Sequence, residues 1–297
     1  MAPDLKSLLT PELFALVLEA RVPFSKTEPI DFGLAIGHIF FESDKDMEAV
    51  RTQAWPALKA LSELGLENIP DLMAFLPPVE SPDFPTQALG LQLLLDQVTR
   101  SLLVGIDTRW VYAYFGEIAV KYALQLQSLP PDLRPTSWAR WKDSVSIDYF
   151  VWVRLFSGAP IVHYERAVEA AVAFTDETRT TVEQHFGIRD PYRDQPEKRW
   201  DLFGFPKMLK TGGPKSPCGA AKGCFWLMCL MDVHKPPLDR YGRYPYQNWR
   251  LGRVSTPEED AWMIEAGMFQ APSDEVAKKI REDVENGEWT PMGSGSE

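Results

Sequence analysis

The residues best suited to chemistry lie in one stretch, Asp239 to Glu259, with the sequence DRYGRYPYQNWRLGRVSTPEE. Its arginines and aromatic residues supply planar hydrogen-bond donors and ring faces, which suit a carboxylate or phosphate bound beside an apolar body. The alternative is a loop that satisfies helix carbonyls and caps the fold. The spacing leaves both interpretations open. In this stretch we assign catalysis to Tyr246 and substrate binding to Arg240, Arg243, Tyr244, Asn248 and Arg253.

A second polar group interrupts the apolar segment 86–105, TQALGLQLLLDQVTRSLLVG. A helix that is apolar almost all round is buried, and buried charges must be paired and hydrogen-bonded. Asp96 and Arg100 are four residues apart and share a face. The favoured interpretation is a structural ion network that holds the downstream loop through Arg240 or Arg243. The alternative is a pocket wall, with Asp96 as acid or base and with Gln97 and Arg100 binding substrate.

Two histidines are candidates for the same pocket. His234 ends the apolar segment 224–234 and is assigned to catalysis, although a hydrogen-bonded helix-end histidine is the more common case. His163 has the same two interpretations and is assigned to substrate binding. Cys218, Cys224 and Cys229 precede His234, but structural zinc sites use a C-x₂₋₄-C pair and the last two cysteines flank apolar residues. We therefore expect reduced thiols, no metal site and no cofactor.

The elements that must position these residues are predicted to be helices. Thr10 followed by Pro11 is typical of a helix start, and Thr256, Pro257 and Glu259 form a capping box with proline at the first helical position. Apolar residues recur with helical spacing in the other segments. Helices are expected from residue 11 to before 23, over 86–105, from 107 or 108 to 130, over 161–174 and 224–234, from 257, and over 273–284.

Two regions are harder to assign. Residues 144–156 are aromatic and β-branched, as in a strand, but their setting among helices favours a buried helix that Pro160 interrupts. Residues 175–223 are polar and rich in glycine and proline, which predicts an irregular insertion with a short helix near 178–185. We expect one all-α domain over residues 1–290 and a flexible tail over 291–297.

Composition limits the classes of function. The chain has 297 residues, 45% of them hydrophobic, and a net charge of −11. That charge opposes binding to nucleic acid, because contacts to phosphates need a surplus of lysine and arginine. No apolar run is long enough to span a membrane, and the N-terminus does not read as a secretory signal. We expect a cytoplasmic protein with a small-molecule partner; its oligomeric state is left open.

Three passages together resemble the uncharacterised DUF924 family. Residues 88–105 match its leucine-rich L-D-Q-x-x-R-x-x-x-x-G pattern, residues 163–170 match an acidic element followed by arginine, and residues 239–259 match its R-F-G-R-F-P-H-R-N-x-x-L-G-R-x-S-T-P-E-E run. The resemblance implies an all-helical fold, a bundle or array of helices like those of tetratricopeptide repeats. It implies no activity.

The chain departs from the family pattern at two places. Tyr246 stands where the family has a histidine, and residues 155–160, LFSGAP, replace its acidic F-E-H-S-E-D loop. The role of bacterial members is therefore not transferred to this chain. The aromatic residues beside the arginine cluster, with no standard cofactor motif in the sequence, lead us to expect an enzyme without a redox cofactor that acts on a small, largely apolar metabolite with an anionic group, as an isomerase or cyclase. The alternative is a non-catalytic helical-repeat module that binds a peptide or protein.

Overall fold

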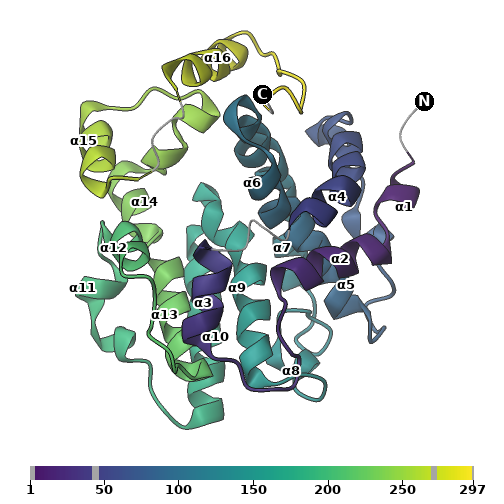
Figure 1. Ribbon diagram of the computed structural model, residues 1–297, viewed down its shortest axis with the longest axis vertical. Coiled ribbons are helices and arrows are strands. Elements are labelled where there is room, and N and C mark those ends of the chain that lie inside the picture. The colour runs from purple at the N-terminus through teal and green to yellow at the C-terminus, as the bar shows by residue number, and fades with distance from the viewer. Residues whose placement is uncertain (1–3, 42–46, 269–272, 296–297) are drawn as a thin grey trace.

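The computed structural model describes residues 4–41, 47–268 and 273–295, and all regular elements in these ranges are helical. The predicted all-α fold is confirmed. Figure 1 shows an array with α1, α2, α4 and α5 on one side, α11 to α15 on the other and α9 between them. The α-helices are α1 (Leu5–Leu8), α2 (Pro11–Arg21), α3 (Phe32–Phe41), α4 (Met47–Ser62), α5 (Phe84–Leu93), α6 (Thr99–Leu102), α7 (Gly116–Gln127), α8 (Trp138–Trp141), α9 (Ile147–His163), α10 (Val168–Phe186), α11 (Pro196–Arg199), α12 (Gly204–Lys210), α13 (Ala220–Asp232), α14 (Lys235–Tyr241), α15 (Pro257–Ala266) and α16 (Asp274–Glu285).

Shorter helical segments connect them. Leu94–Val98 and Trp110–Phe115 are π-helical and continue directly into α6 and α7. The turns of 3-10 helix are Leu66–Asn68, Leu72–Phe75, Gly105–Asp107, Glu165–Ala167, Pro191–Asp194, Pro245–Gln247 and Trp249–Leu251.

The N-terminal half of the array is built on the contact between α2 and α5. The Thr10 side chain accepts a hydrogen bond from the Leu13 N–H group (3.3 Å), so the predicted start of α2 is confirmed. Gly90 permits the close approach of the two helices, because a Cβ atom there would lie 2.4 Å from the Phe14 carbonyl oxygen. The chain then continues as a buried helix through Leu102, as its apolar composition predicts.

Helix α9 is the centre of the array and packs against α5, α7, α10 and α13. The prediction of a buried helix over 144–156 is confirmed, but Pro160 does not interrupt it. Proline has no N–H group to donate to the carbonyl four residues earlier, which here belongs to Phe156. The Gln92 amide reaches the carbonyl oxygens of Phe156 (3.5 Å) and Ser157 (2.7 Å). A side chain from α5 thus takes part in satisfying the carbonyls that face the proline.

The region expected to be irregular is more ordered than its composition indicates. Helix α10 runs unbroken through residue 186, so the short helix predicted near 178–185 is its second half. Three of its polar side chains, Thr175, Thr178 and Arg179, are buried. Arg179 contacts Asp190 and Asp232 at 2.6 Å each, and Arg199 contacts Asp232 at 2.5 Å. These ion pairs tie the segment after α10 to α13.

The C-terminal helices cover one end of the array. The capping box of α15 is confirmed, with Thr256 and Glu259 exchanging hydrogen bonds at 3.3 and 2.7 Å. Beyond α16, the Gly293 and Gly295 N–H groups donate to Asp107 (3.1 and 3.0 Å), within the region predicted as a tail.

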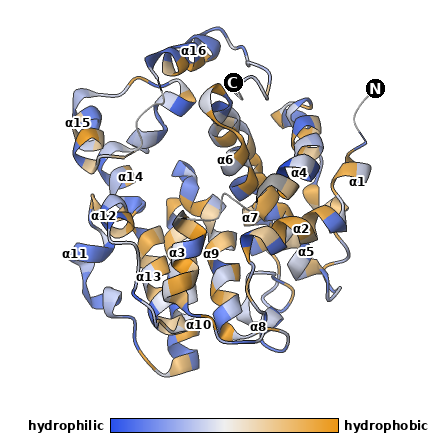
Figure 2. Ribbon diagram, in the orientation of Figure 1, coloured by the Kyte–Doolittle hydropathy of each residue, from blue (hydrophilic) through white to orange (hydrophobic). Residues whose placement is uncertain are grey.

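Hydropathy follows the layout of the array. Figure 2 shows α9 and α13 as largely hydrophobic, whereas the peripheral α11 is hydrophilic. None of the helices in the described ranges combines the length and apolar character needed to cross a membrane.

Candidate functional site

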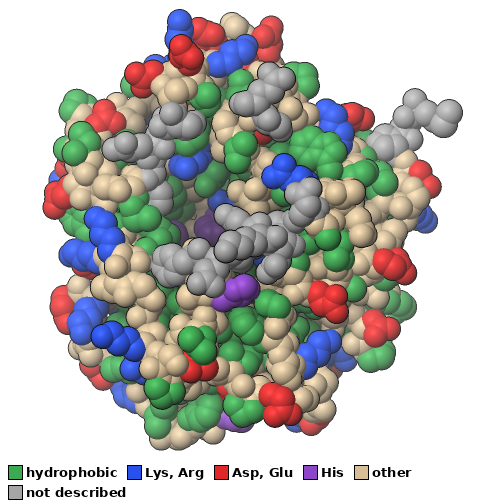
Figure 3. Space-filling model, in the orientation of Figure 1, with side chains coloured by type: hydrophobic (Ala, Val, Ile, Leu, Met, Phe, Trp, Pro, Cys, Tyr) green, Lys and Arg blue, Asp and Glu red, His purple; other side chains and the backbone are tan. Residues whose placement is uncertain are grey.

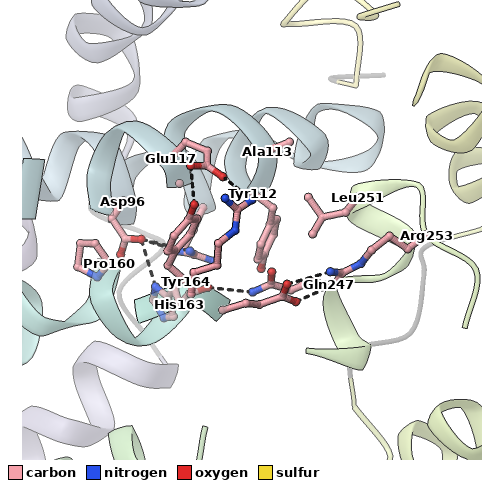
Figure 4. A pocket seen from close by; sticks show the side chains of 14 residues that line it. Asp96, Tyr112, Ala113, Glu117, Pro160, His163, Tyr164, Gln247, Leu251 and Arg253 are labelled. Atoms are coloured by element: carbon pink, nitrogen blue, oxygen red, sulfur yellow. Dashed lines mark hydrogen bonds and ion pairs between the residues drawn. The ribbon is translucent and has the colours of Figure 1, made fainter. Parts of the chain in front are cut away.

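A polar cavity lies where four parts of the chain meet. One face of the molecule is hollowed, and histidine and Lys or Arg side chains are visible in the hollow (Figure 3). The cavity that gathers the predicted site residues has a volume of about 200 Å³. Figure 4 shows its side chains converging from the π-helical segments, the end of α9 and the loop after α14. It is lined by Asp96, Arg100, Tyr112, Ala113, Gly116, Glu117, Pro160, His163, Tyr164, Glu165, Arg166, Gln247, Leu251 and Arg253.

Both π-helical segments place a polar side chain at this cavity. Asp96 lies in Leu94–Val98 and Tyr112 in Trp110–Phe115. A π-helical turn shifts the register of a helix, and such turns are frequent at functional sites. The first one lets an otherwise apolar helix present a carboxylate to the cavity.

Asp96 is the most heavily paired group of the site. Its side chain is 2% exposed, and its Oδ1 atom lies 3.1 Å from Arg100 Nη2 and 3.1 Å from His163 Nδ1. The Gln97 amide donates to its other oxygen. Burial alone would raise the pKa of Asp96, but the positive charge of Arg100 and the interactions with His163 and Gln97 hold it well below its usual range. Asp96 is therefore a fixed negative charge at neutral pH.

His163 is the titratable group between Asp96 and the cavity, and its side chain is 26% exposed. Burial and the charge of Arg100 lower its pKa below 6.5, with Asp96 acting in the opposite direction, so the ring is neutral at pH 7. A neutral ring next to a carboxylate carries its proton on the nitrogen that faces it. The Nδ1–H group therefore donates to Asp96 and Nε2 keeps its lone pair. This arrangement can act as a general base.

His234 lies behind His163 and is held differently. The two rings are 6.1 Å apart between centroids. His234 Nδ1 donates to the carbonyl oxygens of Leu230 (3.0 Å) and Met231 (3.2 Å), as expected for a helix-end histidine. Burial, together with the charge of His163, lowers the pKa of His234 to about 3. His234 borders a much smaller space, of about 10 Å³, and is absent from the lining of the polar cavity.

Tyr244 and Tyr246 stack on each other beside the site, and neither is among the residues that line the polar cavity. The rings of Tyr244 and Tyr246 are 5.0 Å apart and nearly parallel, and the Tyr244 hydroxyl donates to the Val162 carbonyl (2.6 Å). Burial, with further contributions from Tyr244 and Tyr112, raises the pKa of Tyr246 well above 10. The Tyr246 phenol therefore stays protonated at neutral pH.

Arg253 and Gln247 attach the loop to the end of α9. Arg253 makes a bidentate pair with Glu165 (2.9 and 2.8 Å), and Glu165 also accepts from the Tyr244 N–H group (2.8 Å). Gln247 donates to the His163 carbonyl oxygen (3.1 Å). The loop thereby fixes the backbone that carries His163, and Arg253 brings a positive charge to the cavity wall.

Three other loop residues do not line the cavity. Arg243 pairs in a bidentate manner with Glu259 (2.6 and 2.8 Å), and Asn248 donates to the same carboxylate (3.3 Å). Arg240 pairs with Glu258 at the surface. The predicted network in which Asp96 holds the loop through Arg240 or Arg243 is therefore wrong. Each arginine has a nearer partner in α15, and Asp96 is paired within its own helix and with α9.

The structure brings together Asp96, Gln97, Arg100, His163 and Arg253 from the residues predicted for the site. It adds cavity residues that the sequence did not single out: Tyr112, Ala113, Gly116, Glu117, Tyr164, Arg166, Gln247 and Leu251. Tyr112 and Glu117 belong to a segment that reads as an aromatic core helix, so their polar ends carry no sequence signal. Tyr164 could have been found, because it directly follows His163 in one of the matching passages.

The cysteines considered for a zinc site lie in the core. All three thiols are free and buried. Burial raises the pKa of Cys224 and Cys229 to about 12, so both remain protonated at neutral pH.

Comparison with known proteins adds a family. A family model described as a bacterial protein of unknown function (DUF924) matches residues 40–267, which is more than half of the chain. The match runs through 175–223, the part expected to be an insertion. No curated protein and no solved structure matches the chain.

Proposed function

Because the chain belongs to the DUF924 family of bacterial proteins of unknown function, we propose its function from its site: an enzyme that moves a proton within a small anionic metabolite. The observation that carries the proposal is the contact between His163 Nδ1 and Asp96 Oδ1 at 3.1 Å, at the wall of a cavity. A carboxylate that orients a neutral imidazole is a recurrent way to build a general base.

The reaction class follows from the two groups. Nε2 of His163 takes a proton from one atom of the substrate, and the negative charge of Asp96 stabilises the imidazolium that forms. The imidazolium then returns the proton to a different atom, which yields an isomer and restores the neutral ring. A cyclisation started by the same transfer needs no further group. Isomerase or cyclase activity is the type of reaction we propose.

The charge of the site favours a substrate with one negative charge. Three arginines and three carboxylates line the cavity: Arg100, Arg166, Arg253, Asp96, Glu117 and Glu165. Arg250 adds a positive charge next to them, because its guanidinium lies 5.1 Å from the Tyr112 ring centroid and Arg100 lies 4.8 Å from the same ring. Among the described residues, no carboxylate lies within ion-pair distance of Arg250. A carboxylate on the substrate would balance this charge.

The setting of the proposed enzyme follows from the same charges. We propose a cytoplasmic protein whose partner is a small molecule and not a nucleic acid. The net charge of −11 supports this, since it repels a phosphate backbone at long range.

The test is a search for an isomer among metabolites. The wild-type protein is incubated with a metabolite extract, and species of equal mass are separated by chromatography before mass spectrometry. We expect one anion to be depleted and an isomer of the same mass to accumulate. His163→Gln should abolish the conversion, and His185→Gln, which changes a histidine outside the cavity, should leave it intact. Conversion by His163→Gln at the wild-type rate would overturn the proposal.

One observation favours the alternative of a module that binds a peptide or protein. An open apolar groove lies along α7, where Leu66 and Leu124 are 39% and 41% exposed. That function gives His163 and Asp96 no role, so it predicts no isomerisation by the wild-type protein and no change in ligand binding in His163→Gln.

A further inference from the structure

The groove along α7 is the larger of two neighbouring cavities. Its volume is about 760 Å³, and it lies between α7 and the segment that follows α4. Its lining is mostly apolar and consists of Leu66, Ile69, Pro70, Asp71, Leu72, Glu117, Ile118, Val120, Lys121, Tyr122, Leu124, Gln125 and Tyr164. Glu117 and Tyr164 also line the polar cavity. The two cavities therefore share a wall made of two side chains.

This wall is held by one hydrogen bond. The Tyr164 hydroxyl donates to Glu117 Oε2 (2.7 Å), and Arg166 approaches the same carboxylate (3.9 Å). Figure 4 shows Tyr164 beside His163, with its hydroxyl directed at Glu117. Burial, together with Glu117, raises the pKa of Tyr164 to about 12, which keeps the hydroxyl a donor. Glu117 and Tyr164 are thus the side chains that both cavities share, and they are paired with each other.

The two cavities differ in character in a complementary way. The polar cavity holds the charged groups and the base, whereas the groove is mostly apolar and leaves Leu66 and Leu124 39% and 41% exposed. The groove follows α7 from Glu117 to Gln125, eight residues or roughly 12 Å at 1.5 Å per residue. Its far end is polar, where Gln125 donates to Asp71 (3.1 Å). The apolar part thus has a defined length.

We propose that the polar cavity and the groove form one amphipathic site, whose substrate is a monocarboxylate with an extended hydrocarbon body. The carboxylate lies among the arginines near His163, and the body passes between Tyr164 and Glu117 into the groove. Such a body, roughly 12 Å long, matches the groove. This inference rests on the proposed function for its anionic end, and it adds the size and chemistry of the rest of the substrate.

The probes are the linear alkanoates from butanoate to decanoate, with binding measured by NMR titration of the full-length protein. Each added methylene that enters the groove should strengthen binding by about three- to four-fold. Leu124→Gln should weaken decanoate binding by about five- to ten-fold and leave butanoate binding unchanged, because Leu124 lies two turns from Glu117 along α7. The matched control is Ile264→Gln, which changes an exposed apolar residue on α15 (73% exposed).

The outcomes distinguish failure of the groove as a binding site from failure of the anion site on which it depends. Butanoate binding with no gain in affinity for longer chains would overturn the groove and leave the anion site intact. An unchanged decanoate affinity in Leu124→Gln, or an equal loss in Ile264→Gln, would also overturn the groove. If no alkanoate of any length binds, the anion site of the proposed function fails as well.

Discussion

Two histidines of similar sequence context have different capacities for chemistry. The Nδ1–H group of His234 donates to helix carbonyls, its pKa is lowered to about 3, and the space it borders is only about 10 Å³. The ring of His163 is oriented by the carboxylate of Asp96 and lines a cavity of about 200 Å³. We therefore propose His163 as the base, although the sequence favoured His234 for catalysis and His163 for binding. The decisive difference, the contact with Asp96 across 67 positions, is tertiary.

The pH dependence of activity tests the role of His163. Its pKa is lowered by burial and by Arg100, and only the neutral ring is a base. We expect the acid limb of kcat/KM to be centred below pH 6.5, the ordinary value for a histidine. An acid limb centred above pH 6.5 would contradict the assignment. The measurement is a pH–rate profile with the substrate identified by the metabolite search.

The variant Asp96→Asn tests whether the negative charge of Asp96 acts on the His163 ring. The amide keeps the shape of the side chain but carries no charge. In the wild type, the negative charge of Asp96 raises the pKa of His163, so this contribution is lost in the variant. The variant should lower kcat by on the order of 10²-fold or more and move the acid limb to still lower pH. A limb that moves to higher pH would be inconsistent with an ionised Asp96 beside His163.

At the scale of elements, the loop 239–259 combines the two interpretations that its sequence left open. Its first arginines cap and stabilise α15, whereas Arg253 and Gln247 reach α9 and the cavity. The capping box was predictable, because local spacing determines it. The partners of the arginines were not, because each carboxylate lies on a different element or at a distance in sequence.

Arg243→Ala and Arg240→Ala form a matched pair for this loop. Arg243 is bidentate to Glu259, whose side chain is 3% exposed, so its removal should lower the free energy of unfolding by about 2 kcal/mol. Arg240 and Glu258 are both 59% exposed, so water screens their charges and the loss of this pair should change the free energy of unfolding far less. Urea denaturation at pH 7 measures both. Equal effects would mean that the buried pair does not anchor the loop.

Acid should remove the difference between these variants. Hydrogen bonds from Arg243 lower the pKa of Glu259 from 4.5 to about 2. A depressed carboxylate pKa stabilises the fold fully above the unfolded value, near 4.5, and this contribution is lost as the pH falls toward 2. The destabilisation by Arg243→Ala should therefore shrink between pH 4.5 and pH 2. A constant difference across that window would count against the ion pair as its cause.

The positions of the helices were largely predictable from the sequence, but the π-helical segments and the continuity of α9 were not. Apolar spacing and N-caps identify α2, α5, α13, α15 and α16. The π-helical segments and the passage of α9 through Pro160 depend on contacts made by distant residues such as Gln92. The polar second half of α10 looked irregular because its charges find partners only in the folded chain.

At the scale of the molecule, the site exists only where distant parts of the chain converge. Residues 96–100, 112–117, 160–166 and 247–253 form its walls. Sequence patterns pointed to three of these four segments. The segment 112–117 was missed because its tyrosine and glutamate sit in a helix that otherwise reads as core. No local rule distinguishes a core tyrosine from one at a cavity wall.

The C-terminal segment packs against the start of the helix that carries residues 112–117. Trp289 packs on Trp110 (4.4 Å between centroids) and under Arg109 (4.1 Å), and Trp110 donates to the Thr290 carbonyl (3.0 Å). Trp289→Ala should lower the free energy of unfolding by about 1–2 kcal/mol and speed amide hydrogen exchange over residues 110–117. Ile264→Ala, at an exposed position, should do neither. Unchanged exchange over 110–117 would mean that the C-terminal segment does not stabilise this wall of the cavity.

The most direct test of the central claim is NMR of the His163 ring, which needs no substrate. The chain has four histidines, so His163→Gln identifies its signals in a ¹⁵N long-range correlation spectrum recorded from pH 5 to 8. We predict a neutral ring at pH 7 with the proton on Nδ1 and Nε2 unprotonated, titrating with a pKa below 6.5. A ring protonated on Nε2 at pH 7, either as the imidazolium or as the other tautomer, would contradict the account.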